Sequence, residues 1–309
     1  MTGLELPLRG PGGEPVDLWR TLVSHGFHDL APIRVDPDAR TLEATLRLPR
    51  SRPRRVRISA GRKGRATIEV LGGGPVSASA GDALSKGVAS VLHLDHDLSA
   101  FYAKAADDPD LAWVTAGAGR MLRSPTVFED VVKTVCTTNC SWALTVKMVN
   151  ALVINLGEPA VGQPGEPLTN AFPTPEVMAS QDERFYRDVV RSGYRAPNFV
   201  KLARMVAEGE VALEPLATAS RDELPDEEVE ALLLSLPGVG PYAAAHIMMT
   251  LGRNSRLILD SWTRPTYARL AGARKPPPDA RIVRRFAAYG PEAGLAFWLF
   301  VTRDWVSEA

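Results

Sequence analysis

Two features of the segment 225–265 are suited to chemistry: a glycine-rich turn and a single aspartate. The turn Leu236–Gly240 (sequence LPGVG) lies between two stretches of helical periodicity, and its glycines let the backbone approach a ligand closely. Pro241 suits the first position of the second helix, so the free N–H groups of that helix would face the turn and stabilise an anion such as a phosphate. Taken alone, the turn also fits a plain pair of helices with a glycine connection.

Asp260 is the second feature. A short apolar run, 256–259, leads into it, and the residues SWTR that follow are expected to form the first turn of a new helix. An aspartate in this place is most simply an N-cap, because its side chain accepts hydrogen bonds from the first N–H groups of a helix. The turn and the aspartate with a helix between them form a much more specific pattern than either part.

The composition excludes several other kinds of site. Cys136 and Cys140 are the two cysteines of the chain, which are too few for a disulfide framework or a four-cysteine metal or iron–sulfur site. The five histidines are scattered, so no metal constellation emerges. No apolar run reaches the roughly 18–20 residues of a membrane span, and the N-terminus lacks the basic-then-apolar build of a signal peptide. We therefore expect a soluble cytoplasmic protein that does not act at a membrane.

The elements that must position the turn and the aspartate predict an α+β fold. Residues 1–80 should form a small antiparallel sheet domain, because the segments 42–48, 56–60 and 66–70 alternate apolar and polar residues, the last two joined by the hairpin GRKG. Residues 81–309 should form an all-helical body that contains the hairpin 225–252. Its helical segments are expected near 82–105, 126–156, 175–192, 197–208, 225–236, 241–252, 261–271, 278–289 and 292–307.

Charge is balanced over the chain but not along it. The 36 basic and 36 acidic side chains give a formal charge of zero, which is unusual for a protein that binds nucleic acid through a uniformly basic surface. A run of bases occupies outward positions of the predicted strands and hairpin: Arg47, Arg55, Arg57, Arg62, Lys63 and Arg65. These bases would form either a basic face on the sheet or an ordinary solvated strand face.

The turn, the helix and the apolar run ending in Asp260 resemble the signature of the helix-hairpin-helix (HhH-GPD) superfamily of DNA glycosylases. The resemblance covers most of the chain: residues 128–153 are similar to the first core helices of its 8-oxoguanine branch, and 172–175 with 192–206 to the segment before the hairpin. It implies a TATA-binding-protein-like sheet domain ahead of the helices, as in the 8-oxoguanine and 3-methyladenine branches. The iron–sulfur branch is not expected, because it needs four cysteine ligands.

The resemblance also implies how the chain would hold its partner, double-stranded DNA with a damaged base, as a monomer. Such enzymes flip a nucleotide out of the helix and fill the gap that it leaves. Asn139 would fill the gap, and Tyr194 with Arg195 would press into the opposite strand. The hairpin would bind the DNA backbone through Gly238, Val239 and Gly240. No cofactor is implied beyond a K⁺ or Na⁺ ion at the hairpin, held by the backbone carbonyls of Leu234, Leu236 and Val239.

For the chemistry, the resemblance assigns Asp260 as the catalytic carboxylate, which stabilises positive charge on the sugar or activates a water. Bifunctional relatives carry a lysine near the start of the second hairpin helix, and that lysine forms a Schiff base with the sugar. Tyr242 occupies this position here. Because tyrosine cannot form an imine, we expect a monofunctional glycosylase without lyase activity.

The lesion pocket departs from the 8-oxoguanine branch. Leu144 stands where that branch has an arginine that reads the opposite cytosine, and Leu295 and Leu299 align with its pocket glutamine and phenylalanine. The expected pocket is apolar and aromatic, which suits cationic alkylated bases. Alkylated or deaminated purines are thus as plausible as 8-oxoguanine. The residues assigned to the pocket are Tyr242, Trp142, Trp262, His246, Leu295 and Leu299.

Two other functions compete with this interpretation. A non-catalytic DNA-structure binding protein with the glycosylase fold would explain the missing lysine and pocket residues, although the retained Asp260 weighs against it. A helical protein with a charged sheet that docks other proteins would explain neither the hairpin nor Asp260. Lesion-dependent base release that disappears in Asp260→Asn separates both alternatives from an enzyme.

Overall fold

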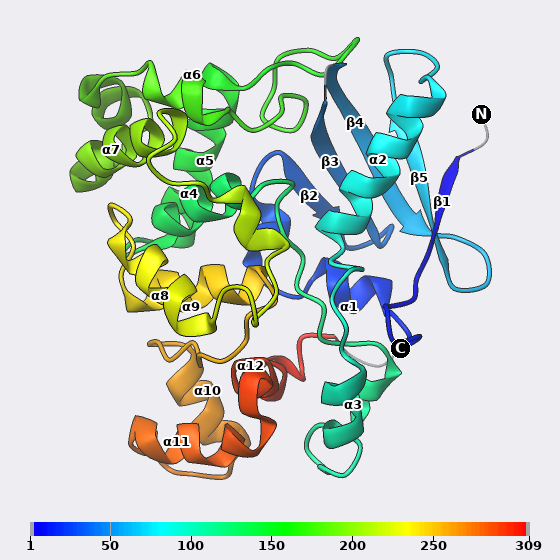
Figure 1. Ribbon diagram of the computed structural model, residues 1–309, viewed down its shortest axis with the longest axis vertical. Helices are drawn as coiled ribbons and strands as arrows, with labels where there is room; N and C mark the ends of the chain where they lie inside the picture. Colours follow the sequence, from blue (N-terminus) through cyan, green and yellow to red (C-terminus); the bar gives the residue numbers. More distant parts are fainter. Residues whose placement is uncertain (1–2, 50, 307–309) are drawn as a thin grey trace.

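The computed structural model describes residues 3–49 and 51–306, with an antiparallel sheet on one side of the molecule and helices on the other (Figure 1). The sheet has five strands in the order β1-β5-β4-β3-β2. All neighbouring strands are antiparallel. None of the helices in this part of the chain is both long and apolar enough to cross a membrane.

The three strands predicted from alternation are present as β3 (Thr41–Leu48), β4 (Ser51–Ala60) and β5 (Arg65–Leu71). The predicted hairpin joins β4 to β5, with Lys63 and Gly64 at φ values of 49° and 72°. The edge strands β1 (Leu4–Pro7) and β2 (Ile33–Asp36) were not predicted. Each has four residues, which is too short for a two-residue period to stand out from the sequence around it.

One face of the sheet packs on two helices, α1 (Leu18–Leu22) and α2 (Ala78–Val91). Figure 1 shows α2 in cyan beside the sheet. Leucine and valine side chains of α2 join the alternate apolar residues of the strands in one core. The sheet unit therefore reaches beyond the expected boundary at residue 80, which falls inside α2.

The opposite face of the sheet is not a basic surface. Glu43 lies between Arg55 and Arg57, with 2.7 Å from its Oε1 to Nη2 of Arg57, and Arg57 also reaches Glu69. Burial would raise the pKa of Glu43, but the hydrogen bonds from Arg57 and Arg55 outweigh it and the pKa is lowered. Arg65 pairs with Glu5 in the same way. The expected run of bases is therefore largely neutralised by acids, which favours the solvated-face interpretation.

The rest of the described chain is helical, as predicted. Three predicted segments are divided: 82–105 into the end of α2 and α3, 126–156 into α4 and α5, and 175–192 into α6 and a π-helical turn at Phe185–Val189. The remaining helices have these bounds: α3 Ser99–Ala105, α4 Val127–Thr137, α5 Trp142–Leu156, α6 Pro175–Ala179, α7 Ala196–Ala207, α8 Asp226–Ser235, α9 Pro241–Thr250, α10 Thr263–Leu270, α11 Asp279–Phe286 and α12 Ala293–Thr302.

Helix α9 lies between two hydrophobic cores and is buried on every side after its first turn. Ala244, Ile247 and Met248 belong to a core shared with α4, α5, α7 and α8. Ala245 and Met249 belong to the core of α3, α10, α11 and α12. A helix that is apolar all round is expected in such a central place. Its first turn is consequently held rigidly against the hairpin that precedes it.

The predicted helical segment 126–156 is interrupted at residues 138–141, where α4 ends and α5 begins. Thr138 is extended and Asn139 has a φ of 46°, a left-handed conformation that asparagine tolerates better than most residues. Ser141 then caps α5 by accepting a hydrogen bond from the Leu144 N–H. The polar run TTNCS thus makes a sharp turn that carries Asn139 to the surface.

Candidate active site and DNA-binding surface

The hairpin between α8 and α9 has the open backbone that its glycines predicted. Gly238 has a φ of +84°, and a Cβ there would lie 3.1 Å from Nδ2 of Asn198. Gly240 is extended, and a Cβ on it would meet nothing within 4 Å. No side chain caps α9, whose first residue is Pro241. The first N–H groups of this helix therefore remain available to an anion that approaches Gly240.

A cleft of about 270 Å³ lies beside the hairpin and brings together residues from three distant segments. The turn after α4 contributes Asn139, the short turn before α7 contributes Tyr194 and Arg195, and the hairpin contributes its glycines and Tyr242. Val239, which we expected at the same surface, points its side chain into the core and is 7% exposed. Only its backbone is thus placed for binding.

Tyr194 is the side chain that protrudes from this cleft, with 62% of its surface exposed. Nδ2 of Asn139 donates a hydrogen bond to its hydroxyl at 3.4 Å. Arg195 lies under the ring of Tyr194, with its guanidinium carbon 4.5 Å from the ring centroid. Arg195 is buried and donates from Nε to Oγ1 of Thr138 at 3.2 Å. In this arrangement Arg195 supports Tyr194 and does not reach outward beside it.

Asp260 caps the turn that starts α10. Its Oδ1 accepts hydrogen bonds from the backbone N–H groups of Trp262 at 2.8 Å and Thr263 at 2.6 Å. Its own N–H donates to Oγ1 of Thr263 at 2.8 Å. Among the described residues, no hydrogen bond reaches the other carboxylate oxygen, Oδ2. The capping role predicted for Asp260 is present, and it fixes the carboxylate while leaving one oxygen for a second task.

Tyr242 and His246 lie one turn apart on α9, with ring centroids 6.0 Å apart, and both respond to the charge of Asp260. Burial, followed by the carboxylate of Asp260, raises the pKa of Tyr242. Burial lowers the pKa of His246 to about 4, and Asp260 opposes only part of that shift. Both side chains are therefore neutral at pH 7 and close enough to Asp260 for its charge to affect them.

A segment that the sequence gave no reason to select completes this group. The ring of Phe27 is 5.2 Å and the ring of His25 is 5.6 Å from the ring of His246. Between them, a Cβ on Gly26 would lie only 2.8 Å from Cη2 of Trp142. Trp142 thus packs on the chain at Gly26. No periodicity marks this short loop, so only the folded chain shows that it closes one side of the site.

Comparisons with known proteins place this arrangement in a known fold. No protein-family model matches the chain. A segment of 83 residues, 26% of this chain, is 31% identical to the curated protein named "Putative DNA-3-methyladenine glycosylase YfjP" of Bacillus subtilis (strain 168). The match spans 27% of the length of that relative.

Solved structures match nearly the whole chain. The 3-methyladenine DNA glycosylase of Archaeoglobus fulgidus has a TM-score of 0.72 at 20% identity, over 98% of this chain and 100% of that one. The 8-oxoguanine glycosylase/lyase of Clostridium acetobutylicum, in its apo form, has a TM-score of 0.67 at 17% identity, over 93% and 92% of the two chains. The chain has the helix-hairpin-helix DNA glycosylase fold.

Within this glycosylase fold, Trp262 lies in a cluster of three tryptophans next to Asp260. Its ring centroid is 6.1 Å from that of Trp298 on α12 and 5.5 Å from that of Trp305 near the C-terminus. Nε1 of Trp298 donates to the carbonyl of Ser24, which fixes the cluster to the loop that carries Phe27. Trp262 and Trp305 are each more than 40% exposed. Sequence reasoning selected Trp262 and missed Trp305.

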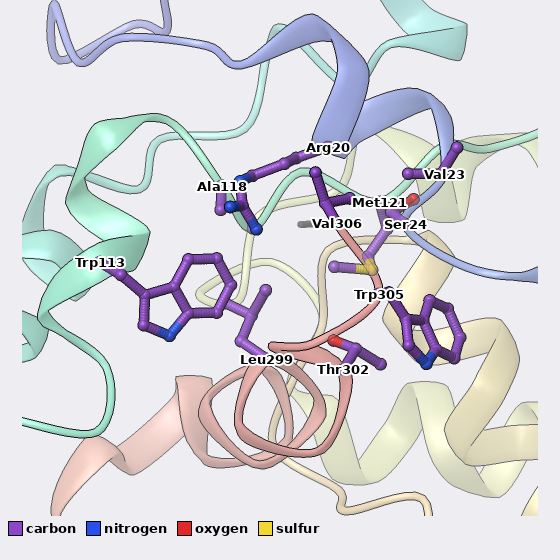
Figure 2. Close-up of a pocket in the computed structure, with 11 residues that line it drawn as sticks. Arg20, Val23, Ser24, Trp113, Ala118, Met121, Leu299, Thr302, Trp305 and Val306 are labelled. Carbon is purple, nitrogen blue, oxygen red and sulfur yellow. The ribbon is translucent and has the colours of Figure 1, made fainter. Parts of the chain in front are cut away.

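The structure does not bring Leu295 and Leu299 to this group. Both are buried in the C-terminal core, and both lie within 4 Å of the place where a Cβ on Gly119 would be. Leu299 also borders the cavity in Figure 2, which holds about 30 Å³, enough for about one or two water molecules. A purine base does not fit there. In this chain, therefore, the two positions that align with the family's pocket residues are core positions.

The expected cation ligands lie at the end of α8. The carbonyl of Leu236 accepts a hydrogen bond from the Val239 N–H at 3.1 Å, which leaves one lone pair for an ion. Leu234 lies two residues earlier, and its side chain is exposed. Within residues 3–49 and 51–306, no group of three or more His, Cys, Asp or Glu side chains is arranged to hold a metal ion. A monovalent ion on the hairpin carbonyls stays a prediction.

Proposed function

We propose that this protein is a monofunctional DNA glycosylase that flips a damaged purine from duplex DNA and hydrolyses its N-glycosidic bond. The observation that carries the proposal is the position of Asp260. Its carboxylate is fixed through Oδ1 by two backbone N–H groups. Its charge affects the pKa values of Tyr242 and His246. A rigid carboxylate beside aromatic side chains, at the start of α10 and close to the helix that follows an open hairpin, fits base excision better than it fits a cap alone.

The DNA backbone would bind at the hairpin. The N-terminus of α9 offers uncapped N–H groups beside Gly240, where nothing obstructs a phosphate. This contact needs no basic surface, which agrees with a formal charge of zero. A second structure of the Clostridium acetobutylicum glycosylase/lyase, at 16% identity, holds double-stranded DNA with cytosine opposite 8-oxoguanine. Asn139 would fill the gap that the flipped nucleotide leaves, and Tyr194, supported by Arg195, would press into the opposite strand.

Hydrolysis then follows from the charges of the site. As the bond between C1′ and the base nitrogen breaks, its electron pair leaves with the base and positive charge develops on the sugar. The carboxylate of Asp260 stabilises this charge, and a water molecule adds to C1′ and gives its proton to that carboxylate. Tyr242 stands where a lyase needs a lysine, and a phenol cannot form a Schiff base. The product is a free base and an intact strand with an abasic site.

The substrate class that we favour is alkylated purine. Tyr242, Trp142 and Trp262 are each at least 37% exposed, so their rings are available to stack on a base. A cationic alkylated base gains additional attraction from aromatic faces and has a weakened glycosidic bond. The Bacillus subtilis and Archaeoglobus fulgidus proteins are both named for 3-methyladenine. Hypoxanthine and 8-oxoguanine are the alternatives that the experiment must separate.

The test is a panel of duplexes carrying alkylated adenine, hypoxanthine, 8-oxoguanine or uracil, treated with the enzyme and then with hot alkali. We expect alkali-dependent breaks with a purine lesion for the wild type and for Asp279→Asn, an exposed aspartate at the start of α11 that pairs with Arg264. Asp260→Asn should lose the activity by at least about a hundredfold while binding DNA equally well. Binding without breaks for any lesion would instead support a non-catalytic DNA-structure binding protein.

A further inference from the structure

His246 has an unusual environment for a buried side chain. It is 8% exposed, and both of its ring nitrogens are buried without a hydrogen-bond partner among the described residues. Neighbouring His25 differs at one nitrogen, because its Nε2 contacts the carbonyl of Leu122 and only its Nδ1 has no described partner. An unsatisfied buried polar atom usually costs a protein about 1–3 kcal/mol. Native structures keep such atoms mainly where a ligand, a water or a functional step supplies the partner.

The groups around His246 belong to the proposed active site. Tyr242 precedes it by one turn on α9, Phe27 and His25 face it from the loop after α1, and Asp260 is close enough to affect its titration. Tyr242 is partly exposed and lines the cleft beside the hairpin, so movement of its ring would open a path from the cleft to the imidazole. His246 is thus behind the entrance through which a flipped base would come.

We propose that His246 is a specificity-determining residue that hydrogen-bonds an edge of the flipped purine, an inference that rests on the proposed glycosylase function. A neutral imidazole presents one N–H donor and one nitrogen acceptor. The two nitrogens point away from each other, so one of them, as donor or as acceptor, would meet a ring nitrogen or an amino group on the purine edge. In the absence of a base, the aromatic side chains close over the ring and leave its nitrogens unsatisfied, and entry of a base relieves that cost.

The neutral state of His246 suits the favoured substrate class. Burial holds its pKa near 4, so the ring carries no charge that would repel a cationic alkylated base at pH 7. The other ionisable groups that face it are His25, also neutral because burial lowers its pKa to about 3, and Tyr242 and Asp260. A protonated histidine in the same place would oppose the binding of a cation.

The test is a pair of measurements on His246→Leu in full-length protein. Removing unsatisfied polar atoms is neutral or favourable for the fold, so the midpoint of thermal unfolding should stay the same or rise. Binding to the lesion duplexes that the wild type excises, measured in the Asp260→Asn background to prevent turnover, should weaken about tenfold. Binding to a duplex with a stable abasic-site analogue should not change, because that duplex contains no base to recognise.

Controls separate this role from packing. His246→Asn keeps a donor and an acceptor and should restore part of the lost affinity, whereas a purely structural role predicts no such rescue. His25→Leu loses the contact with Leu122 and should lower the unfolding midpoint. Equal loss of affinity for the lesion and abasic duplexes, or unchanged base release by His246→Leu, would overturn the inference and leave the Asp260 chemistry intact. Absence of base release by the wild type would overturn the proposed function and this inference together.

Discussion

The outer face of the sheet and the cleft beside the hairpin both carry polar side chains, but they differ in whether those side chains have partners within the fold. On the sheet, Arg55 and Arg57 converge on Glu43, so their charges are satisfied within the fold. At the site, within the described part of the chain, neither nitrogen of His246 has a partner and one oxygen of Asp260 receives no hydrogen bond. Groups that the fold satisfies contribute to stability, whereas groups that it leaves open are available to a ligand.

The two regions should therefore respond in opposite ways to substitution. Changes at the site should reduce function and leave stability unaffected or improved. Changes on the sheet should reduce stability slightly and leave function unaffected. The four predictions that follow test this separation.

Tyr194→Ala should lower base release by roughly tenfold to a hundredfold, because the stacking of an aromatic ring on a base contributes about 1–3 kcal/mol. The unfolding midpoint should not change, since the side chain is 62% exposed. Single-turnover release of the free base and thermal unfolding provide the two measurements. A large drop in the unfolding midpoint would show that Tyr194 stabilises the fold instead of serving DNA binding.

Gly240→Ala should weaken binding to undamaged duplex DNA by about three- to tenfold, the effect of losing about one phosphate contact. The added methyl meets no protein atom within 4 Å, so the fold should tolerate it. Gly238→Ala is the contrasting variant, because a φ of +84° and a contact of 3.1 Å with Asn198 should destabilise the hairpin itself. If Gly240→Ala and the wild type bind duplex DNA with equal affinity, the hairpin does not contact the DNA as proposed.

Acidification should destabilise the protein through its buried histidines. The folded-state pKa values of His25 and His246 are lowered to about 3 and about 4, whereas both side chains bind protons below about 6.5 when the chain unfolds. Stability is therefore complete above pH 6.5 and falls as the pH drops towards 4, by up to about 1.4 kcal/mol per pH unit for each histidine. Thermal unfolding at pH 7.5, 6.0 and 5.0 should show this decrease, and His246→Leu should reduce it. Identical midpoints at pH 7.5 and 5.0 would contradict the buried neutral state.

Arg57→Ala should have the smallest effect. Its ion pairs are partly exposed, so their loss should cost at most about 1 kcal/mol of unfolding free energy. Affinity for DNA and its dependence on salt should stay within about twofold of the wild type. A lower salt dependence would show that the sheet face contacts phosphates, and the contrast between the two regions would fail.

The sequence predicts the elements of this fold whose apolar residues recur at regular intervals. Alternation located β3, β4 and β5, and apolar spacing located the helices, including the hairpin pair around Gly238. The turn at Asn139 and the edge strands are set by tertiary contacts over a few residues, which no period records. The resemblance of the sheet to a TATA-binding-protein-like domain stays a prediction.

The site is predictable only in part, for the same reason. Asp260, Tyr242, Trp142, Trp262 and His246 were selected from their spacing and the family resemblance, and the structure brings them together. The loop at Phe27 and the C-terminal Trp305 contact these residues from distant segments without any sequence signal. Leu295 and Leu299 were selected by alignment alone, which cannot distinguish the core-facing side of α12 from the side that faces the site.

The central claim is excision by Asp260 without strand cleavage, and one reaction tests it most directly. Wild-type protein is incubated with the preferred lesion duplex, and free base, strand breaks before alkali and borohydride-trapped complex are measured on the same sample. We predict free base in an amount that matches the abasic sites, breaks only after alkali, and no trapped complex. Trapped complex in an amount that matches the active enzyme, with breaks before alkali, would contradict the monofunctional mechanism.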